Sequence, residues 1–91
     1  SVAEGWRGEV VHIDRFGNIA TNLPNGLPGR VVKIAGVEVR QGTAYGEGPE
    51  GELIWIQGSD GCIEIAINRD SAARSLGVEV GAETLLYRDG E

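Results

Sequence analysis

The sequence predicts an all-β fold: a small antiparallel β-barrel of the Greek-key, partly open kind, with one short helix near residues 70–76. Three observations support this fold class. Short segments rich in β-branched residues recur along the chain, and turn residues separate them. The fifteen glycines are spread through the 91 residues rather than clustered. Only one segment carries helix-start and helix-stop residues at the right spacing.

The strands are expected in antiparallel pairs joined by short turns. The segment Glu9–Asp14 is expected to form a strand. The strand pattern breaks at Phe16-Gly17-Asn18, and β-branched residues follow the break. In Cys62–Asn68 the three isoleucines share one face, because strand side chains alternate between faces. Prolines 24, 28 and 49 are expected in loops. Further strands are expected at Arg30–Ile34, Val37–Arg40, Glu52–Gln57 and Glu83–Arg88.

Turn and cap residues support the predicted connections. Ala35-Gly36 is a two-residue hairpin signal, and Gly58–Gly61 reads as the loop of a second hairpin. The helix has Asp70 or Ser71 as its N-cap and Gly77 as its C-terminal stop. Residues 1–91 are therefore expected to form a single β-barrel domain.

Composition excludes several classes of function. The net charge is −6 and the eight basic residues are scattered, so no basic stripe for nucleic acid is expected. No apolar run of about 18 residues exists, and the first residues lack a signal-peptide pattern, so no membrane span or secretion is expected. One cysteine (Cys62) and one histidine (His12) argue against a disulfide, a metal site and a serine–histidine–aspartate triad. A reducing, cytoplasmic location fits best.

The segment "IDRFGNIATN", Ile13 to Asn22, has two interpretations. A turn explains Asp14, Gly17 and Asn18, since glycine and asparagine tolerate positive φ and a carboxylate can bind a nearby backbone amide. Phe16 is harder to explain in a turn. An aromatic face beside an asparagine amide and a carboxylate could instead hold a heteroaromatic ligand with polar groups.

Other candidates have similar alternatives. The loop containing Ser59 is a natural hairpin loop, but its amides and hydroxyl could also hold a carboxylate or an amine. Tyr45 is either a half-buried ring or a stacking partner for a base. Trp55 is expected in the core, His12 facing solvent, and Cys62 as a small buried hydrophobe.

Two segments in register, "IDRFGNIATN" and "GSDGCIEIAINRDSAARSLGVEVG", resemble the C-terminal domain of the S-adenosyl-L-methionine (SAM) hydroxide adenosyltransferases, which belong with the fluorinases and chlorinases. The family pattern is approximately D-x-F-G-N-x-x-T-N, then Y before a glycine-containing loop, then N-S-x-G-x-L-x-I-A-x-N, A-A and L-G. The matching residues are Asp14, Phe16, Gly17, Asn18, Thr21, Asn22, Tyr45, Ser59, Gly61, Ile65, Ala66, Asn68, Ala72, Ala73, Leu76 and Gly77.

The resemblance implies a two-domain enzyme whose larger N-terminal α/β domain is absent from this chain. It implies a homotrimer that holds SAM between the N-terminal domain of one subunit and the C-terminal domain of its neighbour. Water, or a halide in the halogenating relatives, would displace methionine at the ribose C5′, so SAM is substrate and no cofactor is expected. The groups that position water would belong to the absent domain, so this chain alone is expected to be inactive.

The resemblance also implies roles for individual residues. Asp14 would bind the methionine ammonium, and Ser59 the methionine end, with help from the loop amides. Asn18 would hydrogen-bond the adenine edge. Phe16 and Tyr45 would wall the site, with Tyr45 stacking on adenine. The adenine would face the backbone of Ile67, Asn68 and Arg69.

Three positions depart from the family pattern. Gly58 stands where asparagine is usual, and Asp60 where a fluorinase carries a basic residue. Ile67 stands where a fluorinase has arginine, which favours the hydrolytic class. Two alternatives stay open: the same domain of a SAM-dependent halogenase, and a non-catalytic oligomerisation or interaction barrel.

Overall fold

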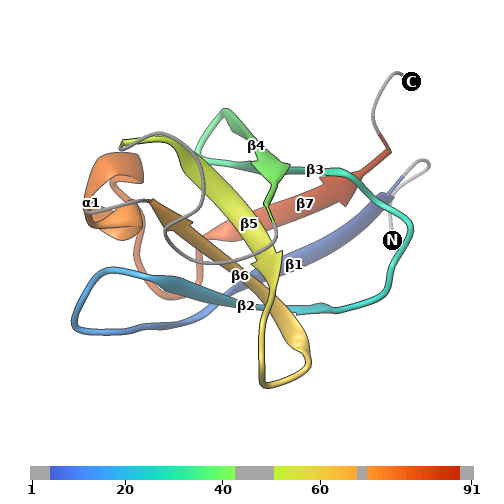
Figure 1. Ribbon diagram of the computed structural model, residues 1–91, viewed down its shortest axis with the longest axis horizontal. Helices are drawn as coiled ribbons and strands as arrows, with labels where there is room; N and C mark the ends of the chain where they lie inside the picture. The colour runs from blue at the N-terminus through green and yellow to red at the C-terminus, as the bar shows by residue number, and fades with distance from the viewer. Residues whose placement is uncertain (1–4, 43–50, 68–69, 89–91) are drawn as a thin grey trace.

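A computed structural model of the chain describes residues 5–42, 51–67 and 70–88. These residues form one closed barrel with a short helix at one end (Figure 1). Around the barrel the strands lie in the order β1-β2-β6-β5-β4-β3-β7. The elements are β1 (Gly5–Ile13), β2 (Ile19–Pro24), β3 (Val31–Ile34), β4 (Val37–Gln41), β5 (Leu53–Gln57), β6 (Cys62–Ile67), α1 (Ala72–Leu76) and β7 (Glu83–Tyr87).

The all-β barrel with one short helix is confirmed, and the barrel is closed where a partly open one was expected. Closure comes from β4 and β5, which pair in parallel through Arg40↔Ile54 and Gln41↔Trp55. The other neighbouring pairs are antiparallel. Parallel strands cannot be joined by a tight turn, so no local turn signal in the sequence predicts the pairing of β4 with β5.

Both predicted hairpins are confirmed. In β3–β4, Ile34 pairs with Val37, and both loop residues have positive φ, 53° at Ala35 and 77° at Gly36. Such a turn matches the right-handed twist of the two strands. The β5–β6 hairpin pairs Gln57 with Ile63 across the Gly58–Gly61 loop.

The helix caps are also as predicted. The Ser71 hydroxyl accepts a hydrogen bond from the Arg74 N–H, and Gly77 ends the helix in the left-handed conformation, with φ of 69°. Several strand ends differ from expectation by one residue, and two larger differences concern β1 and β2. β1 begins at Gly5, because its first half pairs with β7, and Pro24 is the last residue of β2 rather than a loop residue. A strand end tolerates the missing proline N–H.

The core lies inside the barrel and follows the alternation of the strands. Trp55 is buried, and its indole N–H donates to the Arg30 carbonyl at 3.0 Å. His12 is exposed, as expected, while Cys62 is only half-buried. Within the described part of the chain, no helix is long and apolar enough to cross a bilayer. The most deeply buried large apolar residues are Val10, Ile19, Leu23, Val31, Val32, Ile34, Val39, Ile63, Ile65 and Leu86.

Two buried threonines give a matched stability prediction. The Thr84 hydroxyl is buried and has no hydrogen-bond partner among the residues described, so Thr84→Val should raise the free energy of unfolding by about 1 kcal/mol. The Thr21 hydroxyl donates to the Ile63 carbonyl at 2.8 Å and accepts from the Leu23 N–H at 3.2 Å, so Thr21→Val should lower it by about 1–2 kcal/mol. Urea unfolding of both variants measures the difference, and changes of the same sign would contradict the assignment.

Candidate functional site

The turn between β1 and β2 is closed by the carboxylate of Asp14. Its Oδ1 accepts the backbone N–H groups of Phe16 and Asn18, each at 2.9 Å, and its Oδ2 accepts the Asn18 side-chain amide at 3.2 Å. The backbone adds two bonds, from the Asp14 N–H to the Asn18 carbonyl and from the Gly17 N–H to the Asp14 carbonyl. The predicted turn is therefore real, and Asp14 is its organising residue.

These contacts also fix the Asn18 side chain. One hydrogen of its amide is committed to Asp14, while its Oδ1 accepts no hydrogen bond from any described residue. Asn18 is half-buried, so its amide is oriented but remains accessible. A carbonyl oxygen beside an N–H is the pair of groups with which asparagine binds the edge of adenine.

The pKa of the Asp14 carboxyl lies below its ordinary value of 3.8. Burial of the carboxyl raises the pKa, but hydrogen bonds from the Asn18 backbone and side chain, with those from the Phe16 and Gly17 backbone, outweigh burial and lower it. A lowered pKa means that the folded state holds the ionised form more strongly than the unfolded chain does.

A pH dependence of stability follows from this shift. The contribution of Asp14 should be fully present above about pH 4 and should be lost as the pH falls below 3.8 through the folded-state pKa. Urea midpoints measured between about pH 2 and pH 6 should therefore fall less steeply with acid in Asp14→Asn than in the unmodified chain. Equal slopes in the two proteins would contradict the assignment, and Asp60→Asn in the exposed loop is the control.

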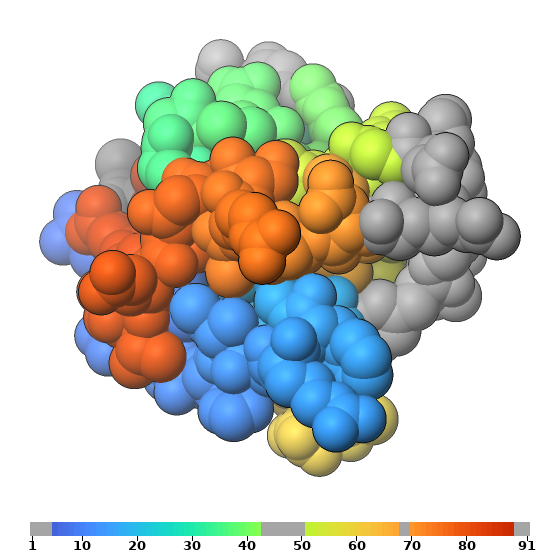
Figure 2. All heavy atoms as spheres, turned by 90° about the vertical axis from the view of Figure 1, so that its left-hand side faces the viewer, coloured from blue at the N-terminus to red at the C-terminus, as the bar shows by residue number. Residues whose placement is uncertain are grey.

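The turn is attached to the N-terminus of α1. The Ala73 N–H donates to the Gly17 carbonyl at 2.9 Å. Gly17 has φ of +87°, and a Cβ added there would overlap the Ser71 hydroxyl oxygen and lie 2.9 Å from the Ser71 Cα. Figure 2 shows α1, in orange, directly above the blue β1–β2 turn at this end of the barrel. Only glycine fits this close approach.

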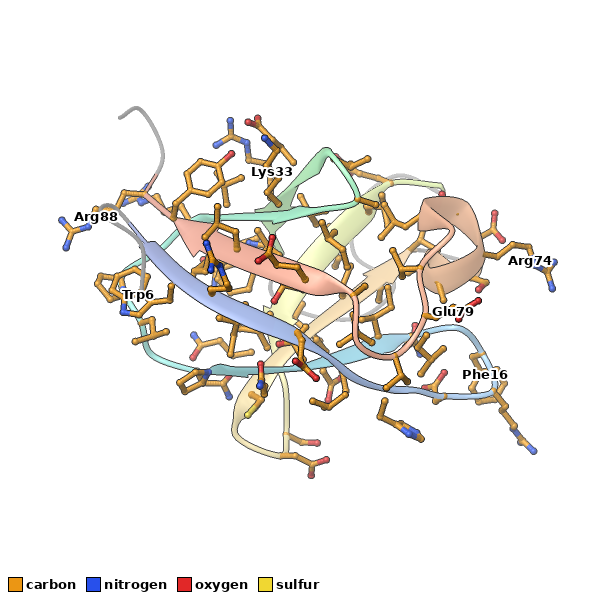
Figure 3. All side chains as sticks on the ribbon, turned by 180° about the vertical axis from the view of Figure 1, so that it is seen from behind. Trp6, Phe16, Lys33, Arg74, Glu79 and Arg88 are labelled. Carbon is orange, nitrogen blue, oxygen red and sulfur yellow. The ribbon has the colours of Figure 1, made fainter. Side chains whose placement is uncertain are left out.

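Phe16 projects from the tip of the turn, with 65% of its surface exposed. The Arg15 guanidinium lies 5.0 Å from the centre of its ring, a cation–π contact. An open depression of about 660 Å³ adjoins it, lined by the turn, both ends of α1 and the segment that follows the helix. In Figure 3, Phe16, Arg74 and Glu79 lie at this end of the molecule, and Trp6 and Arg88 at the other.

Arg74 and Glu79 line this depression and were not among the predicted site residues. Their positions follow from α1 folding back onto the turn, a long-range contact for which the sequence has no local signal. Among the described residues, no group of three or more His, Cys, Asp and Glu side chains could hold a metal ion.

Ile67 lies at the same end of the barrel as the turn. It is the last residue of β6, and α1 is the next element in the order of the chain. Its side chain is buried in the core, so only its backbone could face a ligand. Tyr45, Asn68 and Arg69 lie outside the described residues.

Ser59 lies at the other end of β6. The register of β2 with β6 pairs Ile19 with Ile65 and Pro24 with Cys62, so the β1–β2 turn adjoins the end of β6 and the Ser59 loop adjoins its start (Figure 1). Five residue steps of about 3.3 Å separate these ends, a distance of about 17 Å. A single ligand can touch both only if it extends along the strand.

Two further motif residues have structural partners. The Asn22 side-chain oxygen accepts the Glu9 N–H at 2.8 Å, and Thr21 bridges to β6 as described above. Both lie beside irregularities in the strand pairing, one in β1–β2 and one in β2–β6. They complete backbone hydrogen bonding where the ladders shift register.

Comparison with known proteins identifies relatives of this fold and motif. Residues 8–85 match the family model of the SAM hydroxide adenosyltransferase C-terminal domain. Over 81 residues the chain is 41% identical to the (R)-S-adenosyl-L-methionine hydrolase of Thermus thermophilus, covering 89% of this chain and 32% of that protein.

Solved structures agree with this match. A conserved hypothetical protein from Thermus thermophilus superposes with a TM-score of 0.76 at 36% identity, covering 88% of this chain and 32% of that one. An uncharacterized conserved protein from Thermotoga maritima gives 0.83 at 31% identity, covering 97% of this chain and 38% of that one. The chain thus spans about a third of the length of these relatives.

Proposed function

Because the chain belongs to the SAM hydroxide adenosyltransferase C-terminal domain family, we propose that it is the substrate-binding domain of a SAM hydrolase. The domain binds part of the substrate, and the rest of the pocket comes from the N-terminal domain of a neighbouring subunit in a homotrimer. The observation that carries the proposal is the β1–β2 turn, in which Asp14 presents the Asn18 amide beside an exposed Phe16 ring.

The adenosine end of the substrate lies at this turn. The Asn18 Oδ1 accepts a hydrogen bond from the adenine exocyclic amine, and its second N–H donates to a ring nitrogen. Phe16 supplies an apolar wall, together with Tyr45, and the backbone from Ile67 to Arg69 faces the base. In this arrangement Asp14 acts as a positioning residue through Asn18.

The methionine end lies at the Ser59 loop, so the substrate extends along the outer face of β2 and β6. In the reaction, a water oxygen forms a bond to the ribose C5′ as the bond from C5′ to sulfur breaks. Sulfur takes the electron pair and leaves as the neutral thioether of methionine, and the water gives up one proton. The product is adenosine. The domain binds and orients the substrate, while the groups that position water lie in the rest of the enzyme.

The test is product analysis with the full-length protein. Incubation with SAM, with and without chloride, should give adenosine and methionine in equal amounts in both buffers. A 5′-chloro nucleoside formed only with chloride would instead indicate a halogenase. Absence of any nucleoside product would refute the hydrolase assignment and leave the barrel as an oligomerisation or interaction domain.

A further inference from the structure

We infer that Asn25 is a positioning residue for the methionine end of the substrate, because it holds the Ser59 loop, residues 58–61, in its binding shape. This inference rests on the proposed function, in which that loop binds the methionine end. Three features support it: the hydrogen bonds from Asn25 to both ends of the loop, the exposed tip that these bonds support, and the glycine at position 58.

Asn25 lies beside the Ser59 loop because it directly follows Pro24, the last residue of β2, which pairs with the first residue of β6. Its side-chain amide donates to the Gly58 carbonyl at 2.9 Å. Its backbone N–H donates to the Gly61 carbonyl, also at 2.9 Å. One residue from a different connection therefore fixes the first and the last peptide groups of the loop.

The hydrogen bonds of the loop itself lie at its base. The Gly58 N–H donates to the Cys62 carbonyl at 2.9 Å, and the Gly61 N–H reaches the Gly58 carbonyl only at 3.3 Å. Ser59 and Asp60, at the tip, are exposed and make no hydrogen bond to any described residue. The position of the Ser59 hydroxyl therefore depends on how firmly the two ends of the loop are held.

The loop cannot be held by a side chain of its own first residue. Gly58 stands where the family pattern has asparagine. A Cβ added there would lie 2.5 Å from the Cys62 carbonyl oxygen, a backbone atom that cannot move aside cheaply. The loop in this shape therefore has no amide side chain at position 58, and Asn25 supplies an amide from the end of β2 instead.

The other end of the Asn25 amide shows that this side chain contributes little to stability. Its Oδ1 is buried and accepts no hydrogen bond from any described residue, and an unpaired buried acceptor is unfavourable. This unfavourable burial offsets the bond to the Gly58 carbonyl. The benefit of the side chain lies instead in ligand binding, because a loop that is already ordered loses less conformational freedom when a ligand binds.

The experiment measures the inhibition constants of methionine and of adenosine, the two products, against SAM hydrolysis by the full-length protein. Asn25→Ala should raise the constant for methionine by about 3- to 10-fold and leave that for adenosine within about twofold. Asn25→Asp, which keeps the size of the side chain but loses the N–H donor, should raise the methionine constant at least as much. Combined with Ser59→Ala, Asn25→Ala should add less than its own separate effect, because it acts through the loop.

Ile34→Val is the control for a loss of stability alone. Ile34 is buried in the core on β3, which neighbours β4 and β7 and not β2 or β6, so this variant should lower the urea midpoint and leave both constants unchanged. In Asn25→Ala, equal increases for both products, or none for methionine, would overturn the assignment while wild-type hydrolysis of SAM still supported the proposed function. A wild-type protein that releases no adenosine from SAM would overturn both.

Discussion

Gly17→Ala is expected to lower the free energy of unfolding by about 2–5 kcal/mol. The backbone at Gly17 has φ of +87°, where an alanine costs about 1–2 kcal/mol. The added Cβ would also lie 2.5 Å from the Ser71 Cβ and 2.9 Å from its Cα, and relieving such overlap costs about 1–3 kcal/mol more. The Gly17 carbonyl accepts the Ala73 N–H, so the shift would also loosen the contact between the turn and α1.

Gly26→Ala separates the two contributions. Gly26 has the same φ of +87°, but a Cβ there would meet nothing within 4 Å. It should therefore show the conformational cost alone, about 1–2 kcal/mol. Urea unfolding of both variants gives the difference. Equal losses would mean that the turn does not depend on its close packing against Ser71.

Asn18→Ala is expected to lower kcat/KM of the full-length protein for SAM by about 5- to 150-fold, or about 1–3 kcal/mol. The adenine amine would lose its acceptor, and a buried donor without a partner is costly. The effect should be larger for kcat/KM than for stability, because the backbone bonds between residues 14 and 18 do not need the Asn18 side chain.

The control for this variant is Tyr87→Phe. Tyr87 is on β7, which is not a neighbour of β2 or β6 in the barrel, and its hydroxyl donates to the Glu38 carboxylate at 2.7 Å. Loss of this hydroxyl should leave kcat/KM for SAM unchanged. A normal kcat/KM in Asn18→Ala, with the protein folded, would show that the turn makes no contact with the nucleoside.

Local signals in the sequence account for most of the fold. Ala35-Gly36 and Gly58–Gly61 mark hairpin turns, Ser71 and Gly77 mark the helix ends, and alternating isoleucines mark the inner face of β6. Each signal lies within a few residues of the structure that it specifies. The parallel pairing of β4 with β5 and the early start of β1 depend on partners far away in the sequence, so no short window contains them.

For the candidate site, as for the fold, the sequence predicts the local turn but not the contacts that depend on distant strands. The turn and ligand interpretations of "IDRFGNIATN" combine in one arrangement, since the Asp14 bonds that make the turn also orient Asn18. The separation of Ser59 from Asp14 was not predictable, because it depends on the register of β2 with β6, which are about forty residues apart and joined by other strands. The assignment of Asp14 and Ser59 to the same end of a ligand stays a prediction.

A crystal structure of the full-length protein with adenosine and methionine would test the central claim most directly. The claim predicts the adenine amine within about 2.7–3.2 Å of the Asn18 Oδ1 and the methionine at the Ser59 loop. Adenosine bound elsewhere, with the β1–β2 turn facing only solvent or protein, would contradict the claim that this barrel forms part of the substrate pocket.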